Sequence, residues 1–270
     1  MKFKVNNEDI FASTGGRPLD KKKPLIIFVH GSGLTHMCWV LQTRSFAFHG
    51  YSVLALDLPG HGLSGGNSLQ SIEEMAEWIS DVIDAVDFKE ASLVGHSQGC
   101  LITVECAARY PEKIKTLSLM GGAGAIPINL ELLSLAENND SKAVDLMMDF
   151  AHGPSGHFGG HPVPGLHHLN IGSMLVQSRE VKDTLGVDFR ACQNYTNGFN
   201  AAKKINLPTL SILADQDRMC RVKDGKKLAD HIKNSEVYII ENCGHMMLLE
   251  EADKTLAILK KFIKKNYPAY

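Results

Sequence analysis

The stretch that decides the fold is Gly95-His96-Ser97-Gln98-Gly99, in which a serine stands between two glycines in a G-x-S-x-G pattern. The apolar run before it favours a short buried strand, and the segment after it, free of glycine and proline, favours a helix. Ser97 is therefore expected on a sharp strand-to-helix turn with strained backbone angles, where Gly95 and Gly99 avoid side-chain bulk. Such a turn lifts the Ser97 hydroxyl clear of the sheet and points the backbone N–H of Gln98 toward a developing oxyanion.

Length and composition indicate an ordinary globular protein. The chain has 270 residues, of which 44% are hydrophobic, with a formal net charge of −2. This length can bury a substantial core, and the small net charge gives no reason to expect nucleic acid or an anionic membrane as a partner. The six cysteines are scattered without C-x-x-C pairs, which indicates free thiols in a reducing compartment. With a polar N-terminus and no apolar stretch that could span a bilayer, we expect a cytoplasmic protein.

Strands and helices alternate along most of the chain, which predicts an α/β fold: a mostly parallel, twisted sheet of about eight strands with helices on both faces. The alternation stops after residue 122 and resumes at residue 206. We therefore expect a core domain formed by residues 1–122 and 206–270, with residues 123–205 inserted as a cap at the carboxyl ends of the strands. The expected strands are residues 2–5, 10–13, 25–29, 53–56, 91–94, 116–120, 209–213 and 237–240. The clearest expected helices are residues 71–87, 100–109, 222–233 and 245–265.

A serine hydroxyl needs a base to take its proton, usually a histidine that a carboxylate orients. In a parallel sheet these partners also come from loops that follow strands. Two downstream loops qualify: Ala214-Asp215-Gln216-Asp217 offers carboxylates, and Asn242-Cys243-Gly244-His245 offers an imidazole. The chain order is then serine, acid, histidine.

With these motifs together, the chain resembles the α/β-hydrolase fold family, in its esterase/lipase-like class of serine hydrolases, along essentially its full length. The resemblance implies that Ser97 is the nucleophile and His245 the base, and that Asp217 rather than Asp215 is the acid. The matching segments are residues 30–33 (His-Gly-Ser-Gly), 57–64 (Asp-Leu-Pro-Gly-His-Gly-Leu-Ser), 95–99, 213–217 and 244–245.

The resemblance also implies an oxyanion hole and a pocket. The backbone N–H of Ser32 is expected beside that of Gln98 as the second oxyanion donor. No metal or organic cofactor is implied, and the partner is a small-molecule acyl substrate. The expected substrate-binding residues are Gly33, Leu34, Gly122 and Met246.

The function expected first is hydrolysis of a carboxylic ester or related acyl compound through an acyl-enzyme on Ser97. A carbon–carbon bond hydrolase of the meta-cleavage type is an alternative, because the His30–Gly33 motif followed by Trp39 resembles that group. A cofactor-free perhydrolase or haloperoxidase would use the same triad, and a non-enzymatic binding protein on this fold is a further alternative. The sequence does not specify an oligomeric state.

Several other residues are expected to play structural roles. His30 and His61 are expected to hydrogen-bond backbone around their loops, Asp57 to organise its loop, and Cys100 to pack behind the turn at Ser97. A histidine-rich segment is the remaining candidate for chemistry. It lies among glycines and prolines that do not fix ligand geometry, and it contains no cysteine or carboxylate, so we expect a mobile lid there and no metal. Its histidines are His152, His157, His161, His167 and His168, of which His157 and His161 have ligand-like spacing.

Overall fold

The structure is a computed structural model that describes residues 1–157, 160–179 and 183–269. Within these residues the chain forms an eight-stranded sheet in the order β1-β2-β4-β3-β5-β6-β7-β8. The first two strands pair antiparallel, and all pairs from β4 to β8 are parallel, as the sequence predicted. The strands are β1 (Lys2–Val5), β2 (Glu8–Ser13), β3 (Leu25–Val29), β4 (Ser52–Leu56), β5 (Ala91–His96), β6 (Ile114–Met120), β7 (Thr209–Ala214) and β8 (Ser235–Ile240).

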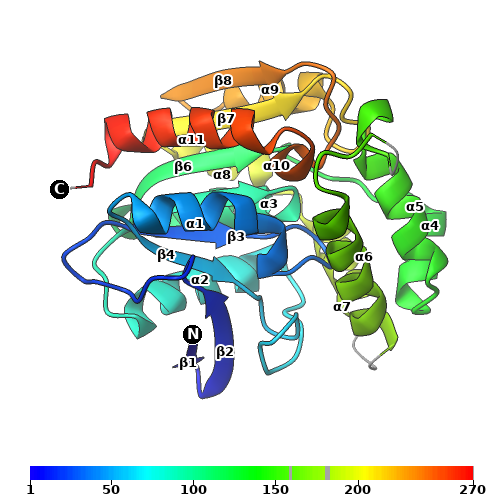
Figure 1. Cartoon of the computed structure of the whole chain (residues 1–270), viewed down its shortest axis with the longest axis horizontal. Coiled ribbons are helices and arrows are strands. Elements are labelled where there is room, and N and C mark those ends of the chain that lie inside the picture. Colours follow the sequence, from blue (N-terminus) through cyan, green and yellow to red (C-terminus); the bar gives the residue numbers. More distant parts are fainter. Residues whose placement is uncertain (158–159, 180–182, 270) are drawn as a thin grey trace.

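Helices cover both faces of the sheet (Figure 1). On one face lie α1 (Val40–Phe48) and α11 (Ala252–Asn266), and on the other lie α2 (Ile72–Ala85), α3 (Gln98–Arg109), α8 (Gly198–Lys204) and α9 (Val222–Ala229). Strand β3 shows why its sequence is apolar throughout: Ile27 packs into the core beneath α2 and α3, whereas Phe28 packs into the core beneath α1 and α11. A central strand covered on both faces needs apolar side chains in both directions.

Local sequence signals explain several element ends. The β1–β2 hairpin turns at Asn6 and Asn7, whose φ angles of 50° and 71° are those of the expected two-residue turn. Helix α2 begins after Ser71, whose hydroxyl accepts a hydrogen bond from the N–H of Glu74 at 3.1 Å. The single helix expected over residues 245–265 is instead two helices, α10 (Met247–Glu250) and α11, because the backbone leaves the helical region at Glu251 (φ −130°, ψ 50°).

The inserted segment contributes four helices beyond the carboxyl ends of the strands, at the right of Figure 1: α4 (Leu130–Glu137), α5 (Lys142–Ala151), α6 (Pro164–Arg179) and α7 (Thr184–Asn194). Helix α8 belongs by sequence to the expected cap but packs against α3. The end of the segment therefore lies with the core layer. Short 3₁₀ helices span His36–Trp39, Pro111–Lys113 and Pro154–Gly156. None of the helices in the described ranges is long and apolar enough to cross a membrane.

Candidate active site

Ser97 lies at the turn between β5 and α3 with φ 55° and ψ −121°, a strained conformation for a residue that carries a side chain. The flanking glycines make this turn possible. A methyl group on Gly95 would overlap the carbonyl group of Gly99, and one on Gly99 would overlap the carbonyl oxygen of Val29. The expected sharp turn is therefore confirmed, and its two glycines are required by contact with neighbouring backbone.

The carboxylate and the imidazole expected downstream come together. Nδ1 of His245 lies 2.7 Å from Oδ2 of Asp217, and both side chains are buried. The other carboxylate oxygen, Oδ1, accepts hydrogen bonds from the backbone N–H groups of Met219 and Cys220, each at 2.8 Å. Because both oxygens are engaged, the carboxylate is fixed in orientation and holds a proton on Nδ1 of His245.

A small cavity of about 30 Å³ joins the serine to the histidine, since both Ser97 and His245 line it. Within the described part of the chain, Nε2 of His245 is buried without a hydrogen-bond partner. Because Nδ1 of His245 carries the proton that it donates to Asp217, Nε2 carries the lone pair that a general base needs. The lining residues are Gly31, Ser32, Leu34, His96, Ser97, Ile126, Ile128, Met147, Ala151, Phe189, Met219, His245 and Met246.

His96, which precedes Ser97, supports the loop that carries His245. Its Nε2 lies 3.0 Å from the carbonyl oxygen of His245 and donates to it. Burial lowers the pKa of His96 to about 3, and the neighbouring His245 adds to this effect. His96 is therefore neutral at physiological pH and positions His245 by a hydrogen bond.

The two residues expected as oxyanion donors, Ser32 and Gln98, both lie near Ser97. Ser32 lines the cavity, and Gln98 is the first residue of α3, whose N–H is among those that a helix leaves without an intrahelical acceptor. The loop that carries Ser32 is held from the inserted segment. Oδ2 of Asp188, in α7, accepts a hydrogen bond from the N–H of Gly33 at 2.8 Å, and its carbonyl oxygen accepts one from the Gln98 side chain at 3.3 Å.

Asp188 also pairs with a buried histidine that carries charge. Nε2 of His61 lies 3.0 Å from Oδ2 of Asp188, and Nδ1 of His61 lies 3.1 Å from the carbonyl oxygen of Pro59. Two acceptors require a proton on each ring nitrogen. Burial alone would lower the pKa of His61, but the Asp188 carboxylate outweighs it and raises that pKa above its usual value. Burial would likewise raise the pKa of Asp188, and the charge of His61 instead brings it below the usual value.

His30 presents the opposite case. Its Nδ1 donates to the carbonyl oxygen of Gly31 at 2.9 Å, and its Nε2 accepts from the N–H of Leu58 at 3.2 Å. One donor and one acceptor define a neutral ring, and burial, with the charge of His61, lowers the pKa of His30 to about 4. The expectation that His30 hydrogen-bonds to backbone is confirmed. For His61 the contact with the Pro59 carbonyl is confirmed, but its ion pair with Asp188 was not expected.

The other structural expectations are confirmed. Asp57 accepts from the N–H of His36 at 2.7 Å and from the N–H of Leu63 at 2.9 Å, so it organises its loop. Cys100 is buried behind the turn, and its thiol donates to the carbonyl oxygen of Gly95 at 3.3 Å.

Only part of the expected pocket lines the cavity. Leu34 and Met246 do, but Gly33 and Gly122 are absent from its lining among the described residues. The N–H of Gly33 is taken by Asp188, and Gly122 packs against the side chain of Cys100. These two glycines therefore shape the walls around the site without facing the cavity. No sequence motif marks Asp188. It lies in the irregular inserted segment, and its partners Gly33 and His61 are distant in the sequence and meet it only in the folded chain.

Comparison with known proteins identifies the family of the chain. A family model described as "Alpha/beta hydrolase family" matches residues 26–258, so the chain belongs to this family and is a hydrolase. A 2-hydroxy-6-oxononadienedioate/2-hydroxy-6-oxononatrienedioate hydrolase of Escherichia coli is 25% identical over 255 residues, covering 89% of this chain and 87% of that protein.

Solved structures are similar over nearly the whole chain. A thermophilic esterase has a TM-score of 0.82 and 25% identity, and the match covers 99% of this chain and 98% of that one. The enol-lactonase from Burkholderia xenovorans LB400 has a TM-score of 0.87 at 19% identity and covers 97% and 99%, which shows a shared fold.

Proposed function

We propose that the protein is a serine hydrolase that cleaves a neutral carboxylic ester or lactone through an acyl-enzyme on Ser97. The observation that carries this proposal is that His245, oriented by Asp217 at 2.7 Å, lines the same small cavity as the strained serine. A strained nucleophile beside an oriented and unpaired imidazole is the arrangement that acyl transfer requires.

In this mechanism Nε2 of His245 takes the proton of the Ser97 hydroxyl as Oγ attacks the substrate carbonyl carbon. The oxyanion lies between the N–H groups of Ser32 and Gln98, where one such donor contributes about 2.7–4 kcal/mol to transition-state stabilisation. His245 then gives the proton to the leaving alcohol oxygen, and the C–O bond breaks. Water, deprotonated by His245, attacks the acyl carbon and releases the acid, restoring the hydroxyl of Ser97.

The cavities favour an apolar substrate. The inner cavity of about 30 Å³ holds about two water molecules. An outer cavity of about 400 Å³ adjoins it and shares five of its lining residues. The shared residues are Ile126, Ile128, Met147, Phe189 and Met219. We infer that α4 to α7 act as the cap and that the side chains between the two cavities move apart to admit an acyl or alcohol group into the apolar outer space.

Charge also favours a neutral reacting group, because the lining of the inner cavity contains no lysine or arginine among the described residues. Arg218 lines the outer cavity, where its guanidinium lies over the ring of Phe150 at 4.9 Å and donates to the carbonyl oxygen of Asp149.

Arg218 is the observation that supports a second candidate, carbon–carbon bond hydrolysis. The name of the Escherichia coli relative specifies substrates with two carboxylates, and a carboxylate in the outer cavity could pair with this cation. A direct comparison of p-nitrophenyl esters with a 2-hydroxy-6-oxo-dienedioate distinguishes the two activities. Faster turnover of the dienedioate, together with its loss in Arg218→Ala, would favour the second.

The proposal is tested by p-nitrophenyl ester hydrolysis with wild type, Ser97→Ala and a matched control, Ser134→Ala, which removes an exposed hydroxyl on α4. Loss of the nucleophile is expected to lower kcat by at least about 10⁴-fold, while the control keeps wild-type activity. Equal activity in Ser97→Ala would refute the acyl-enzyme mechanism. Absence of any turnover or of any reaction with a fluorophosphonate in the folded wild type would favour a binding protein.

A further inference from the structure

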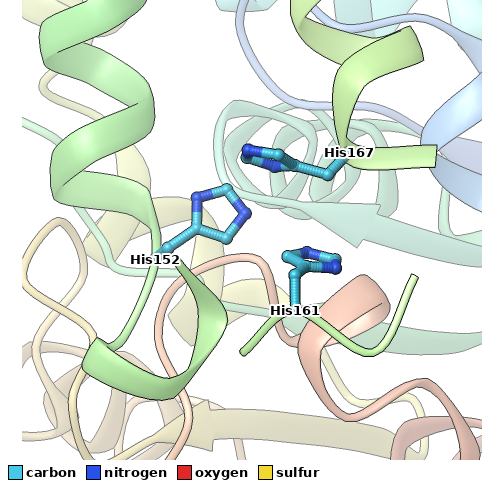
Figure 2. A group of neighbouring side chains, drawn as sticks. All are labelled: His152, His161 and His167. Carbon is cyan, nitrogen blue, oxygen red and sulfur yellow. The ribbon is translucent and has the colours of Figure 1, made fainter. Parts of the chain in front are cut away.

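Three histidine side chains of the inserted segment face one another. His152 directly follows α5, His161 precedes α6, and His167 lies in the first turns of α6 (Figure 2). One ring nitrogen from each lies within 4.8 Å of the others, and their side chains are only 1%, 6% and 8% exposed. The sequence predicted no metal here and singled out the spacing of His157 and His161. The structure instead leaves His157 exposed and groups His161 with two histidines that lie farther away in the sequence.

The facing nitrogens lack partners. Among the described residues, Nε2 of His152, Nε2 of His161 and Nδ1 of His167 are all buried without a hydrogen bond. Buried polar atoms in native proteins are almost always paired. Three unpaired nitrogens on adjacent rings point to one shared ligand, to which His152 already offers an electron pair and His161 offers one once its ring proton moves to Nδ1.

The supporting contacts suit ligation. Nδ1 of His152 donates to the carbonyl oxygen of Met148 at 3.0 Å, which leaves the lone pair on Nε2 directed at the other two rings. A neutral imidazole that donates one ring N–H to a carbonyl and keeps its other nitrogen free is the form of histidine that binds a metal.

We propose that His152, His161 and His167 form a binding site for a divalent metal ion, with Zn²⁺ as the ion it takes. Three imidazoles without a carboxylate or thiol in the group suit zinc and other borderline ions rather than calcium or magnesium. Zinc would occupy the space between the rings, with water in a fourth position.

Loading requires two small changes. Tetrahedral Zn–N bonds of about 2.0–2.1 Å place the nitrogens about 3.3 Å apart, so nitrogens separated by up to 4.8 Å must draw closer when the ion binds. Nδ1 of His161 accepts a hydrogen bond from the N–H of Val163 at 3.1 Å. Ligation through Nε2 moves the ring proton to Nδ1, so this contact with Val163 must be given up.

At this position a bound ion would stabilise the contact between the inserted segment and the loop that carries His245. The carbonyl oxygen of Ala151 accepts a hydrogen bond from the N–H of Met246 at 3.0 Å. Oε2 of Glu250 accepts from the N–H of Gly153 at 3.0 Å and from that of Gly244 at 3.2 Å. Both neighbours of His152 are thus tied to the loop that carries His245. A bound ion would join the end of α5 to the start of α6 and hold this contact in place, whichever substrate the enzyme cleaves.

In the test, the whole 270-residue chain is dialysed against a chelator and then titrated with ZnCl₂ by calorimetry. One ion per chain is expected to bind, and His161→Ala and His167→Ala are each expected to weaken binding by about 100-fold or more. The control is His168→Ala, an exposed histidine next to His167 on the same helix, and it should bind zinc as wild type does.

A second measurement on unmutated protein removes any dependence on the folding of the variants. CoCl₂ is expected to give the intense visible absorption of four-coordinate cobalt, and one equivalent of ZnCl₂ should abolish it. Failure of wild type to bind zinc, unchanged affinity in His161→Ala and His167→Ala, or equal loss in His168→Ala would each overturn the assignment.

Discussion

Replacing Asp188 with asparagine tests how the inserted segment holds the loop that carries Ser32 and Gly33. The carboxylate is buried and receives both the N–H of Gly33 and the charged ring of His61. The amide oxygen can still accept both hydrogen bonds, so the main loss is the attraction to a buried cation. Removing one partner of a buried ion pair lowers the free energy of unfolding by about 3–5 kcal/mol. Because the asparagine keeps the hydrogen bonds, we expect Asp188→Asn to lower it by about 3 kcal/mol.

The loss of unfolding free energy caused by Asp188→Asn must depend on pH. The pKa of His61 is raised in the folded state, so the stability it contributes is complete below its ordinary value of 6.5 and is lost as pH rises through the folded pKa. The pKa of Asp188 is lowered, so its contribution is present above the ordinary value of 3.8 and is lost as pH falls through the folded pKa. The difference in unfolding free energy between wild type and Asp188→Asn should therefore be largest near pH 5–6 and should shrink above neutral pH.

Urea unfolding across this pH range, together with ester hydrolysis, measures both consequences. Loosening of the loop that carries Ser32 is expected to lower kcat/KM by about 10- to 100-fold. The control is Asp183→Asn, at the start of the same helix, whose half-buried carboxylate lies near Arg190 and should contribute no more than about 1 kcal/mol. A pH-independent difference, or one no larger than that of the control, would refute the reasoning.

Three further outcomes follow from the same geometry. Asp217→Asn is expected to lower kcat by about 10⁴-fold, because the amide no longer fixes the proton on Nδ1 of His245. The circular dichroism spectrum should stay unchanged. A loss of less than tenfold would contradict the role given to Asp217. Gly99→Ala, which drives a methyl group into the carbonyl of Val29, should cost about 3 kcal/mol or more in urea unfolding, and wild-type stability would show that this close approach is not required. Met147→Ala, which removes a side chain shared by the two cavities, should raise kcat/KM for p-nitrophenyl octanoate relative to acetate, and an unchanged ratio would contradict the path through the outer cavity.

The sequence predicted the sheet, the sharp turn at Ser97 and the meeting of Asp217 with His245 because these depend on local patterns and on strand order. Strand β3 is apolar at every position, which requires cover on both faces, and Ser97 lies between glycines that only a tight turn explains. Asp217 and His245 each follow a strand of the parallel sheet, so its topology brings them to one edge. These features can be read from the sequence without coordinates.

The inserted segment was not predictable in the same way. Asp188 lies on a helix in a region without alternation, and its pairing with His61 joins residues 127 positions apart. The histidines were judged by the flexibility of the glycines and prolines between them. Their grouping depends instead on α5 and α6, which bring His152 and His167 to His161. Packing between helices, rather than local composition, decides such contacts.

The central claim is that the hydroxyl of Ser97 is the nucleophile that His245 activates. Reacting the wild type with an excess of fluorophosphonate until labelling is complete, and mapping the adduct by peptide mass spectrometry, tests it most directly. We predict one adduct per chain, located on Ser97, and reaction slowed by at least about 10³-fold in His245→Ala. An adduct on another residue, or labelling of Ser97 at an undiminished rate in His245→Ala, would contradict the account.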